Sequence, residues 1–303
     1  MDLLSQSVVF GSVAALTGLG FALLQMASGF PSLSIFGSYV VGYYATFCLG
    51  RLAGVSPYWG LPAAVVLGGA VSLAFYGLAV RPLQRMGADP VRLVLAGLGG
   101  LIVWGAFSQM MAYWLLVRVL SPSVDIAWVV QDRVSLLGVP RMVIVAVLTT
   151  LTATLALQVM KRRTHLGVVI NACSEDPSLA SVCGINPARL QALCWIAAGA
   201  LGGLAGAFYP LALYRGPTSY GWLLAPVAVA AVSASRWGFL GAPVAAIAVV
   251  TASDLSFLAL RSAGIYDFTD VCVLTSFAFL ITLVFLKPKG FDGVYRDVNR
   301  PRS

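Results

Sequence analysis

The sequence predicts an all-α fold, a polytopic membrane bundle of about eight or nine transmembrane helices, some of them broken or re-entrant. Of the 303 residues, 59% are hydrophobic and 10% charged, and the mean hydropathy is +0.90, whereas soluble domains carry about 25% charged residues. Long stretches also lack Asp, Glu, Lys and Arg, and each approaches or exceeds the roughly 20 residues that cross a hydrocarbon core. Basic residues, finally, gather in alternate loops, as in membrane proteins.

The individual spans follow when the charge-free stretches are divided at turn residues. The stretch 3–50 divides near Pro31, and the stretch 52–80 supplies the third span. In order, the spans are 7–28, 34–50, 58–80, 93–117, 141–160, 190–213, 220–235, 238–257 and 269–286. The second and the seventh are short and rich in Gly, Pro or Ser, so either could be broken or cross only partly. Such irregular backbone is tolerated at membrane depth where protein or a water-lined cavity covers it.

The basic residues predict the orientation, because cytoplasmic loops retain Lys and Arg. With the N-terminus outside, the inner segments hold 13 of the 19 basic residues: Arg81, Arg85, Arg92, Lys161, Arg162, Arg163, Arg189, Arg236, Lys287, Lys289, Arg296, Arg300 and Arg302. The outer segments keep Arg51, Arg118, Arg133, Arg141, Arg215 and Arg261. The sequence therefore predicts a multi-pass cell-membrane protein with a cytoplasmic C-terminus.

No Ser-, Pro- or charge-rich linker divides the chain, so we expect one membrane domain over residues 1–303, with a cytoplasmic loop 161–189 and a cytoplasmic tail 287–303. The net charge of +8 is accounted for by inner-face basic residues that are attracted to anionic lipid. Membrane lipid is therefore an expected partner, and nucleic acid is not.

The loop 161–189 contains a compact polar segment with helix start and stop signals. Asp176 suits an N-cap with Pro177 at the first helical position, and Gly184 suits the helix end. Asn186 and Pro187 repeat the start signal. The Asn-Pro-Ala string also resembles a motif of water channels, but those channels need two copies, so we interpret it as a helix start. We interpret Asp176 to Gly184 as a short helix offered to a soluble partner. The alternative is an ordinary capped loop between two spans.

Several kinds of chemistry are not expected. Neither a Gly-Lys phosphate-binding loop nor an H-E-x-x-H or G-x-S-x-G motif occurs, although these motifs carry nucleotide, zinc and acyl-transfer chemistry. The five cysteines form no C-x-x-C pair, and the single histidine, His165, has no ligand set beside it. We therefore expect this chain to have no catalytic residue, no metal site and no bound cofactor. We also expect that it is not an enzyme. Any ATP hydrolysis would belong to another subunit.

Several motifs resemble the permease subunits of branched-chain amino-acid ABC importers, the leucine-type family that also includes urea and amide permeases. The best stretch runs from Asn171 to Asn186 and on through 197–208, and it resembles that family's cytoplasmic coupling segment and the Ala/Gly-rich helix after it. Supporting pieces are 81–85, Gly216-Pro217 with Gly221, 239–242 and 288–293. The resemblance covers nearly the whole chain, and together these motifs are fairly specific.

The resemblance implies an ATP-driven importer subunit, with a coupling helix that docks on a partner ATPase. The implied partners are two ATP-binding-cassette subunits holding ATP and Mg, a second related permease and an extracytoplasmic solute-binding protein. The implied coupling residues are Ser174, Glu175, Asp176, Pro177, Leu179, Ala180, Val182 and Gly184. Leu179 and Val182 are expected to dominate docking, with Glu175 and Asp176 setting the orientation.

The expected translocation pathway rests on small and ionisable residues, namely Gly37, Gly99, Gly100 and Asp254. An acid inside a span suggests a polar path, although Asp254 could also reach Arg261 or water. Two departures leave the solute open: the family's early Asn-x-Ala-His-Gly signature is missing, and its later Gly-Gly-x-Gly-Ser reads 231–235 as Ala-Val-Ser-Ala-Ser.

Two other classes of protein remain as alternatives. A stand-alone secondary transporter or channel for a small polar solute predicts acids or polar pairs inside the spans, and only Asp254 approaches that description. A non-transporting membrane scaffold predicts no polar-lined cavity.

Overall fold

The computed structural model describes residues 3–30, 32–51, 56–119, 135–136, 139–164, 167–170, 173, 186–212 and 250. The described chain is all-α apart from one short antiparallel pair, β1 (Ser135–Leu136) with β2 (Val139–Pro140). The helices are α1 (Leu3–Ser28), α2 (Ile35–Arg51), η1 (Pro57–Trp59), α3 (Gly60–Phe75), η2 (Tyr76–Val80), α4 (Arg81–Arg85), α5 (Pro90–Val119), α6 (Arg141–Arg163) and α9 (Pro187–Ala212).

Five of these helical stretches are long and apolar enough to cross a membrane: Val8–Ser28, Gly60–Arg85, Pro90–Leu115, Arg141–Arg163 and Pro187–Pro210. They correspond to the first, third, fourth, fifth and sixth predicted spans. The second is one continuous α-helix, α2, of 17 residues, which at 1.5 Å per residue is about 26 Å long. The predicted spans 220–235, 238–257 and 269–286 lie outside the described residues, apart from Val250, and so does the tail 287–303.

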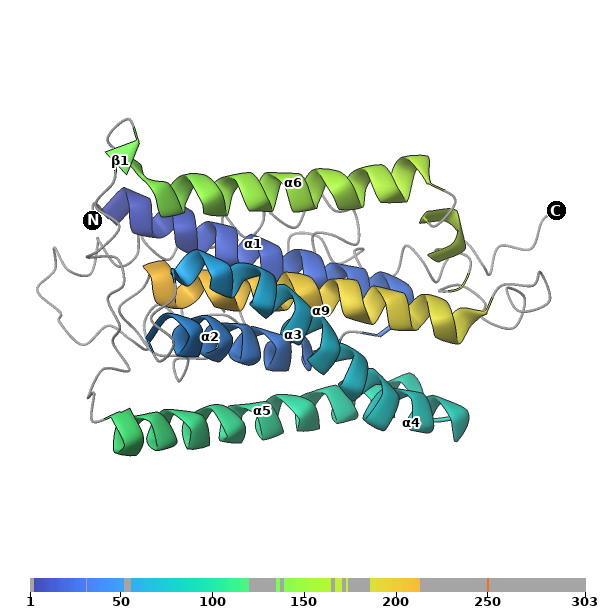
Figure 1. The fold of residues 1–303 in the computed structure, drawn as a ribbon. Helices are drawn as coiled ribbons and strands as arrows, with labels where there is room; N and C mark the ends of the chain where they lie inside the picture. The colour runs from blue at the N-terminus through green and yellow to red at the C-terminus, as the bar shows by residue number, and fades with distance from the viewer. Residues whose placement is uncertain are drawn as a thin grey trace, which may run out of the picture.

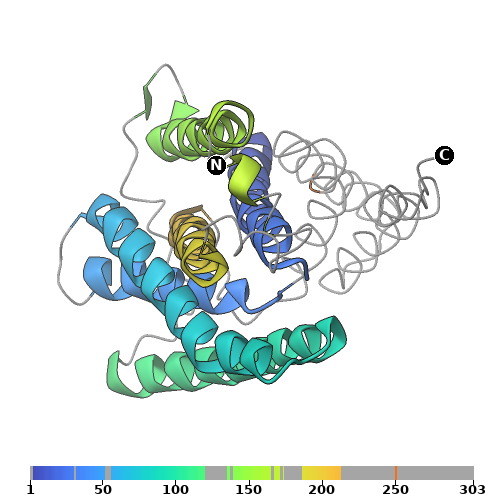
Figure 2. The same ribbon diagram turned by 90° about the vertical axis from the view of Figure 1, so that its right-hand side faces the viewer.

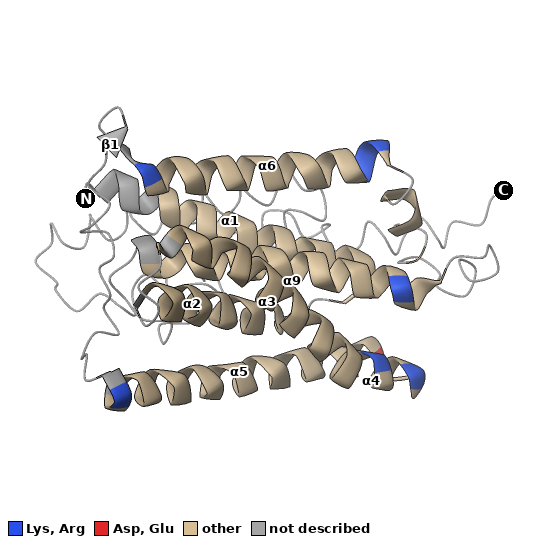
Figure 3. Ribbon diagram, in the orientation of Figure 1, with Lys and Arg blue, Asp and Glu red and all other residues tan. Residues whose placement is uncertain are grey.

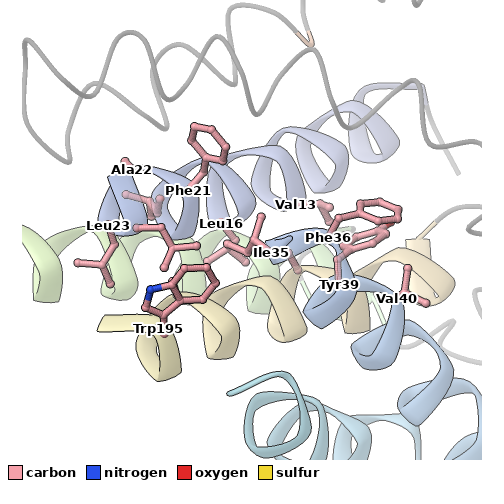
Figure 4. Close-up of a cluster of buried hydrophobic side chains, with 14 of the residues drawn as sticks. Val13, Leu16, Phe21, Ala22, Leu23, Ile35, Phe36, Tyr39, Val40 and Trp195 are labelled. Atoms are coloured by element: carbon pink, nitrogen blue, oxygen red, sulfur yellow. The ribbon is translucent and has the colours of Figure 1, made fainter. Parts of the chain in front are cut away.

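Helix α9 lies at the centre of the described bundle. It packs against α1, α2 and α3, while α6 runs along α1 and α5 passes on the other side of α2 (Figures 1 and 2). The main core joins α1, α2 and α9. Figure 4 shows Leu16 and Leu23 from α1, Ile35 and Tyr39 from α2, and Trp195 from α9 within this cluster.

Glycines let α9 approach its neighbours until their backbones touch. A side chain at Gly42 would collide with the backbone of Gly203, and a Cβ at Gly68 would lie 2.5 Å from the carbonyl oxygen of Gly199. Ser38 Oγ adds a hydrogen bond of 2.9 Å to the carbonyl of Gly68. Close backbone approach through small residues is typical of membrane helices. The glycine-containing run 198–204 of α9 therefore packs closely against its neighbours.

Apolar side chains cover the outer faces of the bundle. On α6 the exposed ones recur every three or four residues: Ile144, Leu148, Leu151, Leu155 and Val159. The face of α6 that points inward instead carries the buried Ala146, Thr150 and Thr154. An exposed apolar stripe of this length on a multi-pass protein suits contact with lipid or with another apolar helix.

Candidate coupling site at the basic end of the bundle

The basic residues divide between the two ends of the bundle. The C-terminal end of α6, the N-terminal end of α9 and the junction of α4 with α5 meet at one end (Figures 1 and 3). These elements carry Arg81, Arg85, Arg92, Lys161, Arg162, Arg163 and Arg189. The opposite end has Arg118 in the last turn of α5 and Arg141 at the start of α6. Described residues that the sequence assigns to the inner side thus share one end, here called the basic end.

The predicted coupling residues Ser174, Glu175, Asp176, Pro177, Leu179, Ala180, Val182 and Gly184 lie outside the described residues. The chain on both sides of them is described, however. It comprises the helical turn 167–170 with Cys173 before the segment, and Asn186 with α9 after it. The site is therefore defined by these two attachment points at the basic end.

The entry to the segment is fixed by a tight turn after α6. The Gly167 N–H donates to the carbonyl of Thr164 at 3.1 Å, and Gly167 lies so close to the backbone of Lys161 that any side chain there would collide. Ile170 and Cys173 then enter the main core, 5% and 1% exposed. Burial raises the pKa of the Cys173 thiol, so this cysteine is a neutral packing group.

The exit from the segment is fixed by a helix cap. Asn186 Oδ1 accepts a hydrogen bond of 3.2 Å from the Arg189 N–H, and the Leu190 N–H donates to the Asn186 carbonyl at 3.2 Å. Pro187 occupies the first helical position, where its missing N–H costs nothing. The predicted helix start is confirmed, and the Asn-Pro-Ala string opens a continuous helix of 26 residues.

The first turns of α9 are tied to η2 by Tyr76, which the sequence analysis did not identify. Its hydroxyl lies 3.2 Å from the Ala188 carbonyl oxygen and 3.2 Å from Gln191 Oε1. Its ring lies 5.7 Å from that of Trp195, and Trp195 Nε1 donates to Ser28 Oγ at 3.2 Å. Contacts at the start of α9 therefore extend to both η2 and the end of α1. The signal in the sequence that could have pointed to this contact is Gln191, a polar residue one turn into an apolar span.

The structure describes three of the four predicted pathway residues. Gly37 on α2 faces the indole of Trp104, and a Cβ at Gly100 would lie 2.6 Å from Phe75. Both are packing positions where α5 meets its neighbours. Among the described residues, nothing lies within 4 Å of a Cβ built at Gly99, and Asp254 lies outside them. A role in translocation stays a prediction for all four.

Few metal-ligating side chains lie in the described part of the chain. The described residues contain no group of three or more His, Cys, Asp or Glu that could hold a metal ion. Cys48, Cys173 and Cys194, the cysteines of the described chain, are free thiols. The described chain on the two sides of the segment is attached to the helix at the centre of the bundle and to the core.

An apolar multi-helix bundle with five helical stretches long enough to cross a bilayer defines a multi-pass integral membrane protein. Comparison with known families gives its membership. The chain belongs to the family described as branched-chain amino acid transport system / permease component, which matches residues 3–286. This confirms the predicted permease subunit of an ABC importer.

Relatives agree with this assignment. The chain is 26% identical over 295 residues to the probable branched-chain amino acid transport permease protein LivH of Methanocaldococcus jannaschii, covering 96% of this chain and 92% of the relative. It is 27% identical over 301 residues to the high-affinity branched-chain amino acid transport system permease protein LivH of Escherichia coli K12, covering 94% and 93%. No solved structure matches.

Proposed function

We propose that this permease works with two ATP-binding-cassette ATPases, a second related permease and an extracytoplasmic solute-binding protein to import branched-chain or related amino acids. The names of the relatives support the solute class. The observation that carries the mechanism is the anchoring of both ends of residues 174–185 at the basic end of the bundle.

In this proposal the basic end faces the cytoplasm and the N-terminus lies outside, because cytoplasmic ends retain Lys and Arg. The chain itself performs no bond chemistry. ATP and Mg are held by the partner ATPases, and the permease supplies two helix packings of different stability that ATP binding selects between.

The coupling segment transmits the movement of the ATPases. Leu179 and Val182 dock in an apolar groove of the partner, and Glu175 and Asp176 set the orientation. Because Asn186, two residues after Gly184, caps α9, displacement of the segment moves the start of α9. That helix touches α2 and α3 backbone to backbone, so the displacement passes to the spans around the expected pathway at Gly37, Gly99, Gly100 and Asp254.

The described spans offer nothing to a self-sufficient secondary transporter. Between their first and last turns, α1, α2, α3, α5, α6 and α9 contain no Asp or Glu, whereas ion coupling in a membrane relies on such groups. The energy is therefore expected to come from outside the chain.

Reconstitution tests the proposal. The chain is co-expressed with the two ATPases and the second permease that the proposal names, purified and placed in liposomes, and uptake of radiolabelled leucine is measured. We expect uptake only with ATP on the ATPase side and the solute-binding protein on the other. Ion-driven uptake by the chain alone would replace this proposal with a secondary transporter. If the ATPase does not co-purify and no uptake is measured, the chain would instead be a non-transporting scaffold.

A further inference from the structure

We infer that Tyr76 is a positioning residue that links the start of α9 to a movable turn in the third span, so that displacement of the coupling segment rotates α4 relative to α3. The inference rests on the proposed function and names the route by which that site acts. Tyr76 touches neither solute nor nucleotide in this scheme.

The third span changes helix type at Tyr76. Residues Tyr76–Val80 form a π-helical turn between α3 and α4. A π-turn holds one residue more than an α-turn in its hydrogen-bonded ring, and such turns occur often at functional sites. Since an α-helix advances about 100° per residue, gain or loss of the extra residue would rotate everything that follows by about that angle. Residues 81–85 and the start of α5 follow directly.

Few contacts restrain this turn. Within η2 only Tyr76 and Val80 are buried, 3% and 1% exposed, while Leu78 is 82% exposed. Among the described residues, nothing lies within 4 Å of a Cβ built at Gly77. Within the described part of the chain, the π-turn is therefore held by few buried side chains, and the Tyr76 hydroxyl is bonded to α9.

The contact of Tyr76 with α9 can exist in two arrangements. Its hydroxyl lies at the same distance, 3.2 Å, from the backbone carbonyl of Ala188 and from Gln191 Oε1. A hydroxyl has one proton to donate, so a small shift of α9 decides which acceptor receives it. Ala188 is two residues beyond the Asn186 cap, and thus close to the end of the coupling segment.

The rest of the contact between α3 and α9 acts as a fixed point. There Gly68 lies against Gly199 and Gly203, with their backbones in contact, and close-packed interfaces of this kind do not deform gradually. The close contact continues to Ser72, which lies against Gly199, and Tyr76 is four residues further along the span, about 6 Å at 1.5 Å per residue. Movement of α9 relative to α3 is therefore concentrated at the end where a long side chain replaces the glycine contact.

The test uses the assembled transporter and the matched variants Tyr76→Phe and Tyr44→Phe. Both remove one hydroxyl and keep the ring, and Tyr44 donates to the Ser108 carbonyl at 2.8 Å, where α2 meets α5. We measure leucine imported per ATP hydrolysed, together with backbone hydrogen exchange in peptides that cover residues 76–86, with and without nucleotide.

We expect nucleotide to change exchange over residues 76–86 in the wild-type complex and in Tyr44→Phe. In Tyr76→Phe that change should be lost. Leucine imported per ATP should fall about three- to tenfold, which is the fold-change that corresponds to the net free energy of one hydrogen bond. Equal ratios and equal exchange in the two variants would overturn the inference. Should Tyr76→Phe accumulate poorly, Gln191→Met removes one of the two acceptors of the Tyr76 hydroxyl and leaves the ring contact in place. It must lower leucine per ATP relative to Tyr44→Phe, or the inference falls. A wild-type complex without ATP-driven uptake would instead refute the proposed function.

Discussion

Asn186 Oδ1 accepts a hydrogen bond from the Arg189 N–H at 3.2 Å, and this contact joins the end of the coupling segment to the helix at the centre of the bundle. The first N–H groups of a helix have no partner within it, so the cap stabilises the turn that any displacement of the segment must move. A frayed first turn would absorb the displacement instead.

Replacing the cap should therefore weaken both stability and coupling. We expect Asn186→Ala to lower the free energy of unfolding by about 1 kcal/mol, while Asn186→Asp, which keeps a capping oxygen, should lose little. Thermal unfolding in detergent measures the first effect, and faster hydrogen exchange over residues 187–192 locates it. Equal behaviour of the two variants would show that the side-chain oxygen contributes nothing.

The glycine contacts of α9 predict a second pair of variants. Gly203→Ala places a Cβ against the backbone of Ala64, and overpacking of this kind costs about 1–3 kcal/mol. The same change at Gly105, where the described structure leaves a Cβ free of contacts within 4 Å, should be neutral or should stabilise the helix by up to about 1 kcal/mol. The midpoints of thermal unfolding compare them, and a Gly203→Ala midpoint at or above that of Gly105→Ala would contradict the packing described here.

The charge pattern predicted much of this fold because it reports where the chain leaves the membrane. Arg81, Arg141 and Arg163 lie at or near the ends of spans, and Asn186 with Pro187 correctly marked the start of α9. These signals are local in sequence, and the free energies behind them, desolvation of charge and capping of N–H groups, act locally as well.

The contacts between helices could not be predicted in the same way. Hydropathy is nearly uniform around each span, so it does not show which face of a helix meets which neighbour. The meeting of Tyr76 with Gln191, 115 residues apart, is therefore invisible in the sequence. The π-turn at Tyr76–Val80 is hidden as well, because its residues are as apolar as the α-helix around it. The glycine run 198–204 suits close packing, but nothing in it shows that Gly42 and Gly68 are its partners.

The anchor before the coupling segment predicts slow thiol chemistry. In a variant that retains Cys173 as its single cysteine, maleimide labelling at pH 7 should be far slower than in a matched variant with Thr164→Cys as its single cysteine, because Thr164 is exposed and Cys173 is buried. Burial raises the pKa of Cys173, and the thiolate is the reactive form. Its labelling rate should therefore keep rising with pH above about 8.5, the usual cysteine pKa. Similar rates for both cysteines at pH 7 would show that the chain before the segment is not anchored in the core.

Docking of the coupling segment on the ATPase predicts the last pair of variants. Leu179→Asp puts a charge where an apolar contact is expected, and a charge buried without a partner is costly, so ATP-driven leucine uptake should be abolished while the protein still reaches the membrane. Met86→Asp makes the same kind of change at the basic end but outside the segment, on a side chain that is 82% exposed, and it should retain uptake. Membrane-fraction immunoblots check the amount of each variant, and co-purification of the ATPase reports docking. Because the two variants differ in position and not in added charge, unimpaired uptake with Leu179→Asp would remove the coupling segment from the mechanism, whereas equal loss in both would assign the effect to charge at this end of the bundle.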